Sequence, residues 1–249
     1  MTSPLVFVPV YGQLDLTRRA LRALDAHTPG DVPFLVVDDC GPDRVAESWL
    51  EDVLQPSRAR RLIVNEENLG FVRSANVAFA QRDGHDVVVV NSDVVVFAGW
   101  LAHLRAAAGE GVASVTALSN NGSVATVPDP TQYPTLESLS ALAAQADADP
   151  APPFDIPVGV GHCIYLAGEA LADVGVFDEA FSPGYGEEVD WSIRARRRGW
   201  RHMAAPGAIV WHDAGASFGR RRLLRRKHEL QLAVRYPREF VGLRLGRLT

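Results

Sequence analysis

Residues 87–97 read VVVVNSDVVVF, two short apolar runs that flank a polar turn. A continuous run of this length is typical of a strand buried on both faces of a parallel sheet. Asp93 closes the turn, and a carboxylate that follows a buried strand costs free energy unless it is paired or binds a cation. Two interpretations of Asp93 stay open: a helix cap, or a ligand for Mg²⁺ or Mn²⁺ beside diphosphate oxygens.

Upstream of this stretch, apolar runs alternate with segments of helical spacing. We expect strands at 5–10, 34–37, 61–64 and 86–90, and helices at 14–27, 44–54 and 71–81. Such repetition predicts a parallel sheet with helices on both faces and right-handed crossovers. Polar residues follow each of these strands, at Tyr11, Asp38–Asp39, 65–68 and 91–93. Ligands of open α/β sheets bind at the carboxyl ends of the strands, so these exits form the candidate site.

Downstream of the stretch, the alternation is looser. We expect helices at 100–108, 136–146, 169–174 and 188–198, and strands at 112–118, 158–166 and 209–211. Residues 119–134 are rich in Asn, Gly, Pro and Asp, and 147–157 is rich in proline. Both segments therefore predict loops.

The composition is that of an ordinary globular protein. The chain has 249 residues, of which 47% are hydrophobic and 22% charged, which excludes a disordered or coiled-coil chain. We find no apolar run long enough to span a bilayer and no secretion signal at the N-terminus. Cys40 and Cys163 form no CxxC pair. We therefore expect a reduced, cytoplasmic protein without disulfides or structural zinc.

The net charge of −5 is unevenly distributed. Residues 218–249 hold ten basic and two acidic residues, a net charge of +8, which leaves −13 on residues 1–217. An acidic body argues against nucleic-acid binding. Leu223, Leu224 and Leu230 among the arginines of 219–230 predict a basic amphipathic helix. Its partner stays open between an anionic membrane, a second subunit and solvent.

Two common α/β enzyme classes lack their motifs here. The sequence has no GxGxxG after the first strand and no GxxxxGK[ST]. These absences argue against a dinucleotide-dependent oxidoreductase and a P-loop hydrolase.

Five motifs follow one another along the chain: Val8–Tyr11, Val36–Asp39, Asn68–Phe71, Asn91–Asp93 and Gly186–Trp191. In this order they resemble the family 2 glycosyltransferases, over roughly residues 4–219. The resemblance implies the GT-A fold, an α/β fold with a mostly parallel, Rossmann-like sheet flanked by helices, and with acceptor-side loops. It also implies an inverting, hexosyltransferase-like enzyme that moves a sugar from a nucleotide-diphosphate sugar to an acceptor hydroxyl. Residues 119–121, 176–179 and 212–219 resemble a bacterial branch that acts on surface polysaccharides and secondary metabolites.

The same resemblance implies a division of the chain. Residues 1–219 would form the glycosyltransferase domain, with a nucleotide-sugar half at 1–118 and an acceptor and catalytic half at 119–219. Residues 220–249 would follow as a basic helical tail.

The resemblance places the nucleotide site at the strand exits. The nucleotide-binding residues it implies are Pro9, Val10, Tyr11, Asp39, Asn68, Gly70, Asn76, Asn91, Ser92 and Asp93. Asp39 would hydrogen-bond the edge of the base. Asn91 stands where the family's DxD motif has its first aspartate, which leaves Asp93 as the expected ligand for Mn²⁺ or Mg²⁺. His212 would supply a second metal or phosphate contact, the alternative being a strand-end histidine satisfied by the backbone.

An acidic cluster, Glu187, Glu188 and Asp190, opens the helix expected at 188–198. The helix dipole favours acidic residues in a first turn, but mutual repulsion among three of them raises the pKa of one. The resemblance implies that Glu188 is the general base and Asp190 a second catalytic residue that supports it, for instance through Arg194. The donor would be a UDP- or dTDP-sugar, and the acceptor a small molecule or a lipid-linked compound.

Two other functions remain open. Asn91 stands in place of the first aspartate of the family's DxD motif, which is compatible with a sugar-nucleotide-binding scaffold of the same fold that has lost catalysis. A sugar nucleotidyltransferase would need a glycine-rich loop after the first strand, where only Gly12 follows Tyr11.

Overall fold

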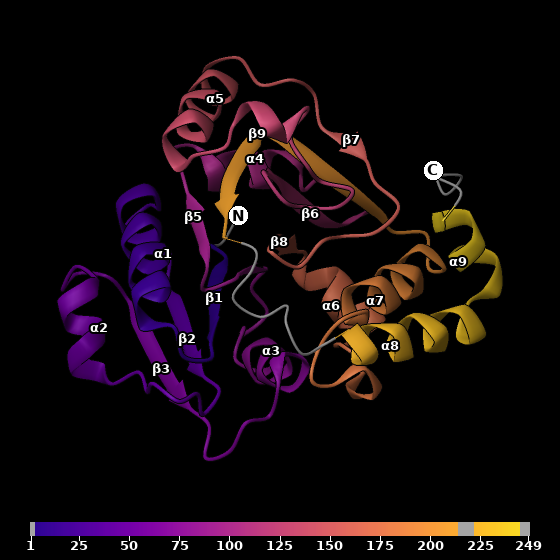
Figure 1. Cartoon of the computed structure of the whole chain (residues 1–249), viewed down its shortest axis with the longest axis horizontal. Coiled ribbons are helices and arrows are strands. Elements are labelled where there is room, and N and C mark those ends of the chain that lie inside the picture. The colour runs from indigo at the N-terminus through magenta and orange to yellow at the C-terminus, as the bar shows by residue number, and fades with distance from the viewer. Residues whose placement is uncertain (1–2, 214–221, 245–249) are drawn as a thin grey trace.

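The computed structural model describes residues 3–213 and 222–244, which fold around one mixed sheet (Figure 1). The strands are β1 Leu5–Val10, β2 Phe34–Asp38, β3 Arg60–Val64, β4 Val87–Val90, β5 Val94–Val96, β6 Val112–Ser119, β7 Phe154–Asp155, β8 Cys163–Leu166 and β9 Arg201–His212. The helices are α1 Leu14–His27, α2 Glu47–Val53, α3 Phe71–Ala80, α4 Trp100–Ala107, α5 Leu136–Ala148, α6 Gly168–Val174, α7 Glu187–Arg196, α8 Arg222–Arg235 and α9 Pro237–Arg244. Short 3-10 helices lie at Pro130–Gln132 and Glu179–Phe181.

The strand order is β3-β2-β1-β4-β8-β6-β9-β5, with β7 paired to β9. Strands β1 to β4 are parallel, and β6 and β9 are parallel to each other. β8 runs antiparallel to both β4 and β6, so β4, β6 and β9 share one direction. The expected parallel sheet is therefore confirmed for most strands, whereas β5, β7 and β8 run the opposite way.

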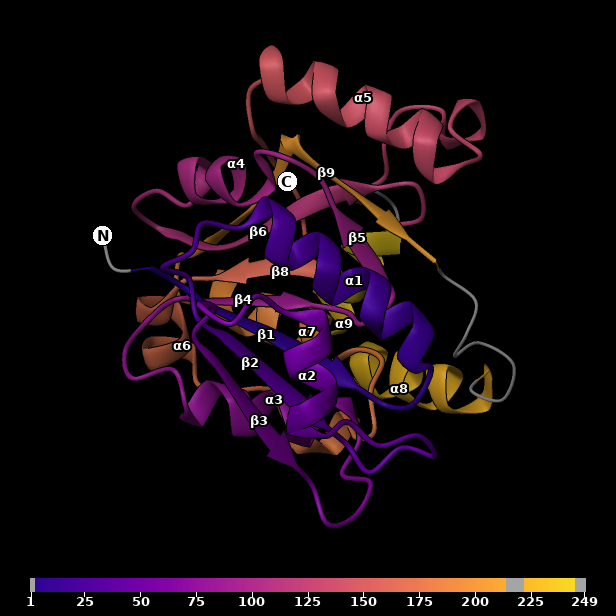
Figure 2. The ribbon, with the colours of Figure 1, turned by 90° about the vertical axis from the view of Figure 1, so that its left-hand side faces the viewer.

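Alternation along the strands builds a core on each face of the sheet, because successive side chains point to opposite sides. Val6 and Val8 of β1 pack in a cluster with α1, α2 and α4. Phe7, between them, packs with α3, α6 and α7. Figure 1 shows α1 and α2 to the left of β1–β3, and α3, α6 and α7 to their right. Figure 2 shows α5 at the β5–β9 end, where Leu139 packs with Ile209 of β9.

Two strand predictions in the second half are wrong in extent. The strand expected at 209–211 begins at Arg201, because the chain continues through Pro206 and Gly207 with a register shift against β6 instead of a loop. The strand expected at 158–166 begins only at Cys163. Gly159 and Gly161 lie before it, where glycine is a poor strand former.

The strand directions bring many polar residues to one edge of the sheet. The parallel strands β1 to β4, β6 and β9 all end there, and β5, antiparallel to β9, begins there. The residues that this places at the edge are Tyr11, Asp39, Asn65, Asn91, Ser92, Asp93, Asn120 and His212.

Helices α8 and α9 pack against the α3–α6–α7 face. Leu232 and Tyr236 are buried in the cluster of that face, and Phe240 and Leu243 pack beside them. The helix expected at 219–230 runs from Arg222 to Arg235. The first three residues of the expected helix, 219–221, lie outside the described residues, and so do residues 214–219 of the motif at 212–219. Among residues 3–213 and 222–244, none of the helices has both the length and the apolar character that a bilayer span takes.

Candidate active site

The turn Asn91–Asp93 is fixed by backbone hydrogen bonds. The Val94 N–H donates to the Asn91 carbonyl at 3.0 Å, and the Asn91 N–H donates to the His162 carbonyl at 3.0 Å. β5 then pairs with β9 so that Val94 lies opposite His212. This register brings the Asp93 Oδ1 to 3.5 Å from the His212 Nε2. The two residues expected at the metal site are therefore neighbours.

His212 is oriented by the loop after β6. The Asn120 side-chain amide donates to the His212 carbonyl at 3.2 Å, and its Oδ1 accepts from the His212 N–H at 2.8 Å. The His212 Nδ1 lies 3.3 Å from the Asn121 carbonyl. A proton on Nδ1 satisfies that contact and leaves Nε2 facing Asp93. Burial lowers the pKa of His212, but the hydrogen bond and the charge of Asp93 outweigh it and raise the pKa above its ordinary value.

A second histidine, missed by the sequence analysis, lies behind the first. The rings of His162 and His212 stack with centroids 5.5 Å apart and planes 16° apart. The His162 Nε2 lies 3.0 Å from the Ala117 carbonyl. Burial, together with the charge of His212, lowers the pKa of His162 to about 3, so its ring is neutral. No local pattern signals this contact, because it arises where β8 and β9 both pair with β6.

On the other side of the edge, Asp39 organises the loop that begins α3. Its carboxylate accepts hydrogen bonds from the Asn65 side chain at 2.9 Å and from the Leu69 and Gly70 N–H groups at 2.8 Å each. Asp39 is buried. The adjacent Asp38 is fully buried and accepts from Arg44 and from the Val45 N–H, which supports the end of β2.

Gly70 joins this loop to the approach of α7. Its φ is +79°, and a Cβ there would lie 2.5 Å from the Pro183 Cβ. The Phe71 N–H also donates to the Pro183 carbonyl at 2.8 Å. The segment that leads into α7 is thus pressed against the start of α3. This contact brings the first turn of α7 to the same edge of the sheet as Asp39.

The other expected nucleotide residues differ in their surroundings. Tyr11 is 49% exposed, whereas Val10 is buried and Pro9 half-buried. Asn68 is exposed, and its Oδ1 accepts from the Gly70 N–H. Asn76 is engaged elsewhere: its amide donates to the Phe177 carbonyl at 3.0 Å and accepts from the Phe177 N–H at 3.1 Å. Asn76 therefore joins α3 to the segment after α6 through these two hydrogen bonds.

The acidic cluster divides into three environments. Glu187 is buried, and burial with the adjacent Glu188 charge raises its pKa well above the ordinary value. Glu188 is half-buried, and its Oε2 lies 3.3 Å from the Gly186 N–H.

Asp190 is fully buried, and its carboxylate is engaged in internal hydrogen bonds. It accepts from the Arg194 Nε at 2.8 Å, as expected, and also from Arg235 at 2.8 Å and the Tyr236 hydroxyl at 2.7 Å. Neither partner on the α8 side was predicted from the sequence. This geometry limits the expected catalytic role: Asp190 acts on the first turn of α7 only through its neighbours.

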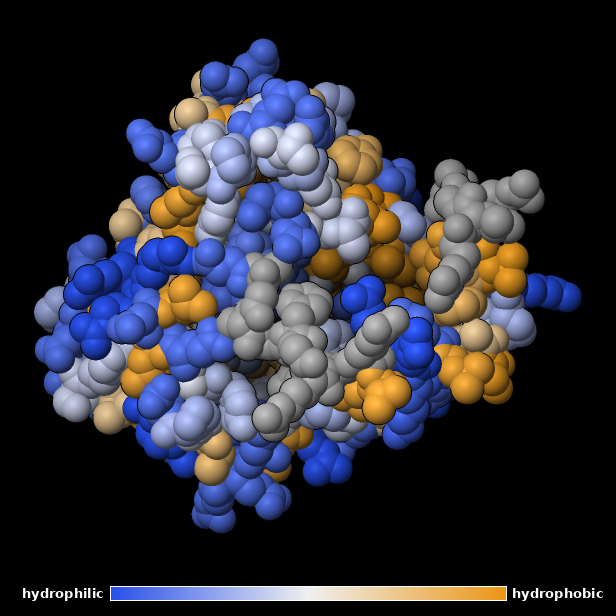
Figure 3. Space-filling view, in the orientation of Figure 1, coloured by the Kyte–Doolittle hydropathy of each residue, from blue (hydrophilic) through white to orange (hydrophobic). Residues whose placement is uncertain are grey.

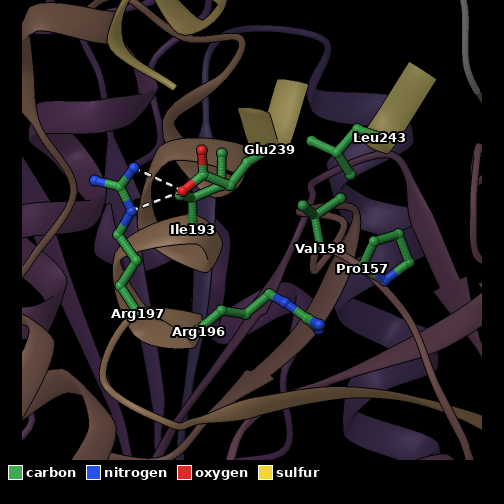
Figure 4. A pocket seen from close by; sticks show the side chains of 7 residues that line it. All are labelled: Pro157, Val158, Ile193, Arg196, Arg197, Glu239 and Leu243. Carbon is green, nitrogen blue, oxygen red and sulfur yellow. Dashed lines mark hydrogen bonds and ion pairs between the residues drawn. The ribbon is translucent and has the colours of Figure 1, made fainter. Parts of the chain in front are cut away.

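Two hollows of the surface lie apart from these residues. One, of about 170 Å³, is a seam between α7 and α9 that includes Ile193, Leu243 and Pro157 (Figure 4). The Arg197–Glu239 ion pair closes one side of it. The other, of about 610 Å³, lies beside the start of α1, over Leu14, Arg18 and Trp49. Neither hollow includes Asp93 or Glu188 among its lining residues.

The donor set at Asp93 and His212 fits a divalent cation that a ligand helps to hold. A carboxylate and an imidazole face each other there, and Asp93 keeps 21% of its side chain exposed. Within the described ranges, no group of three or more His, Cys, Asp or Glu side chains converges as metal ligands. A cation at this place therefore takes its remaining oxygens from a bound phosphate or from water, as Mg²⁺ commonly does.

Comparisons with known proteins agree with the fold described above. The family model described as glycosyl transferase family 2 matches residues 5–175. A comparison with curated protein sequences finds no significant match.

Several solved structures share the fold. GalNAc-T7 with UDP, GalNAc and Mn²⁺ superposes with a TM-score of 0.71 at 12% identity, over 96% of this chain and 50% of that one. The mannosyltransferase PcManGT from Pyrobaculum calidifontis, with GDP-Man and Mn²⁺, gives 0.68 at 21% identity, over 96% and 67%. S. aureus TarS 1–349 with UDP-GlcNAc gives 0.61 at 18% identity, over 93% and 66%. The chain thus spans half the length of GalNAc-T7.

Proposed function

The chain belongs to glycosyl transferase family 2, and we propose on this premise that it transfers a sugar from a nucleotide-diphosphate sugar to an acceptor hydroxyl with inversion at the anomeric carbon. The observation that carries the proposal is the Asp93–His212 pair, which the β5–β9 register holds at the carboxyl edge of the sheet. Ligands of open α/β sheets bind at this edge.

Asp93 and His212 would hold the divalent ion, Mn²⁺ or Mg²⁺. When bound, this ion supplies neutralisation of the charge that develops on the leaving diphosphate. Asn120 and Asn121 fix the His212 ring so that its Nε2 stays directed toward Asp93. Asn91 and Ser92, on the same turn, would donate hydrogen bonds to the phosphate or the ribose.

Glu188 would be the general base. It takes the proton of the acceptor hydroxyl as that oxygen bonds to the anomeric carbon and the bond from this carbon to the diphosphate oxygen breaks. Glu188 is suited to this because it is half-buried at the first turn of α7. Glu187 is buried, and the Asp190 carboxylate already accepts hydrogen bonds from three side chains. Asp190 supports the base by holding Arg194 and the α7 turn.

Tyr11 and the Asp39 loop would form the base pocket. The exposed ring of Tyr11 offers a surface for stacking, and the preceding Pro9 and Val10 would line the pocket with it. Asp39 fixes the Leu69 and Gly70 backbone and so sets the shape of the pocket, in addition to its expected contact with the base edge. We propose a UDP- or dTDP-sugar as donor and a small or lipid-linked acceptor, in the cytoplasm of a bacterium.

Slow donor hydrolysis tests the function without knowledge of the acceptor. The protein is incubated with UDP-, dTDP- and GDP-sugars, with Mn²⁺, Mg²⁺ or EDTA, and released nucleotide diphosphate is measured. We expect hydrolysis of one donor class that needs the cation and is lost in Asp93→Ala. Nucleotide binding without hydrolysis would instead support a scaffold. Conversion of the donor and added pyrophosphate into nucleoside triphosphate and sugar 1-phosphate would support a nucleotidyltransferase.

A further inference from the structure

Helix α8 is fastened to the body along its inner face. Leu232 and His228 are buried there. The His228 Nδ1 contacts the Gly184 and Tyr185 carbonyls at 3.1 and 2.8 Å. Arg235 at the end of the helix pairs with Asp190 at 2.8 Å. The helix is therefore an integral part of the folded body, and its orientation is fixed.

The outer face of the same helix is also apolar. Leu223 is 80% exposed, Val234 75% and Leu230 67%, the three largest exposed fractions among the large hydrophobic side chains of the described residues. They stand at positions i, i+7 and i+11, which share one helix face, and the helical spacing puts His228 and Leu232 on the opposite face. A surface helix of a globular protein has one apolar face, so the second one needs another explanation.

Cations flank this outer stripe. Arg226 and Lys227 are exposed and stand three or four residues from Leu223 and Leu230, next to them on the helix surface. With Arg222, Arg225 and Arg235 against Glu229, the α8 sequence carries a net charge of +4. Figure 3 shows hydrophobic side chains gathered over α8 and α9 with strongly hydrophilic ones between them.

We propose that the outer face of α8 docks on an anionic membrane surface. Leu223, Leu230 and Val234 enter the interfacial layer, and Arg226 and Lys227 meet the lipid phosphates. A second copy fits this face less well. A two-fold interface would bring the same patch against itself, and its cations would then repel one another.

Docking would also set the orientation of the first turn of α7 relative to the bilayer. His228 holds the segment that enters α7, and Asp190 joins the first turn of α7 to Arg235 and Tyr236. The first turn that carries Glu188 is thus fixed relative to the docking face. The docking proposal does not depend on sugar transfer, because vesicle binding needs neither donor nor acceptor.

Vesicle flotation with the full chain tests the proposal. Liposomes of phosphatidylcholine alone are compared with liposomes that contain about 30% phosphatidylglycerol. We expect binding to the anionic vesicles only, and a loss by about tenfold in the triple variant Leu223→Ser, Leu230→Ser, Val234→Ser, because each removes an inserting side chain. The pair Arg226→Glu, Lys227→Glu should lower binding as strongly and make it insensitive to salt.

Val64→Ser and Val176→Ser form the matched control, because these side chains are 46% and 45% exposed on other parts of the body. The control should bind vesicles like the parent, and all variants should keep the parent's melting temperature. Equal binding to neutral and anionic vesicles, or unchanged binding of the triple variant, would overturn the proposal. So would a dimer in solution, detected by light scattering, that the triple variant abolishes.

Discussion

At the scale of the residue, two adjacent glutamates at the start of α7 have different surroundings. Glu187 is buried, and burial with the adjacent Glu188 charge raises its pKa and so favours its neutral form, whereas the Glu188 side chain is only half-buried. Environments that separate the protonation states of neighbouring carboxyls are a common way to assign one acid and one base. Here the assignment leaves Glu188 as the group able to accept a proton.

We expect Glu188→Gln to lower turnover by about 10²–10⁴, because an amide cannot take the acceptor proton. Nucleotide diphosphate binding, measured by calorimetry, should stay within about twofold, since Glu188 acts on the acceptor side. Glu187→Gln is the matched control: an amide replaces a buried carboxyl whose raised pKa favours its neutral form, so turnover should change little. Equal losses in both variants would assign the base to neither residue.

Substitutions at the expected metal site can either remove a carboxylate or add one. Asp93→Asn removes the carboxylate and should weaken Mn²⁺-dependent binding of a nucleotide diphosphate by at least about tenfold. Asn91→Asp adds a second carboxylate to the same turn and should tighten it. Asp31→Asn, an exposed position before β2 at the opposite edge, should have no effect. Titration of the nucleotide with and without Mn²⁺ measures all three, and an unchanged affinity in Asp93→Asn would remove this residue from the site.

At the scale of the element, local patterns predicted the first half of the fold closely. β1 at 5–10 and α1 at 14–27 have the expected bounds, because a short apolar run and a periodic amphipathic segment are complete signals in themselves. The extent of β9 could not be predicted, since Pro206 and Gly207 within it normally end a strand.

For the site, the sequence indicated Asp93 and His212 through their motifs, and the structure brings them together. It gave no indication of His162 or of the Asp190 contacts with Arg235 and Tyr236. Those contacts join elements more than forty residues apart, and no periodicity encodes such pairs. For Asn120 and Asn121, the sequence provided partial information. Amide side chains directly after a strand indicate a polar site, but they do not indicate that their partner is His212.

The attachment of α8 depends on a buried carboxylate with three partners. Tyr236→Phe keeps the ring under the Arg197 guanidinium and removes only the hydroxyl that donates to Asp190. We expect the free energy of unfolding to fall by about 2 kcal/mol, as for other hydrogen bonds to a charged group. Urea denaturation measures this, and limited proteolysis should cut first within 222–244. A stability equal to that of the parent would show that Arg194 and Arg235 alone satisfy Asp190.

At the scale of the whole molecule, two buried histidines make stability depend on pH. Burial lowers the pKa of His162 to about 3 and that of His202 to about 4, whereas both titrate near 6.5 in the unfolded chain. Below pH 6.5 the unfolded chain therefore binds protons that the folded chain does not. Their contribution to stability is complete above pH 6.5 and is lost as the pH falls toward 4. Glu187 acts in the opposite direction, because its raised pKa favours the folded state as the pH falls.

A comparison of variants isolates the histidine contribution, since the Glu187 effect is common to all of them. Each unit of pKa difference is worth about 1.4 kcal/mol, so the parent should lose roughly 2 kcal/mol per histidine between pH 6.5 and pH 5. His162→Gln can still donate to the Ala117 carbonyl but cannot titrate, and should flatten the pH dependence by about half. His27→Gln, at an exposed site at the end of α1, should leave it as steep as in the parent. Urea denaturation at pH 5, 5.75, 6.5 and 7.25 gives the slopes, and an equal slope for parent and His162→Gln would mean that His162 is protonated in the folded protein, in conflict with its burial beside His212.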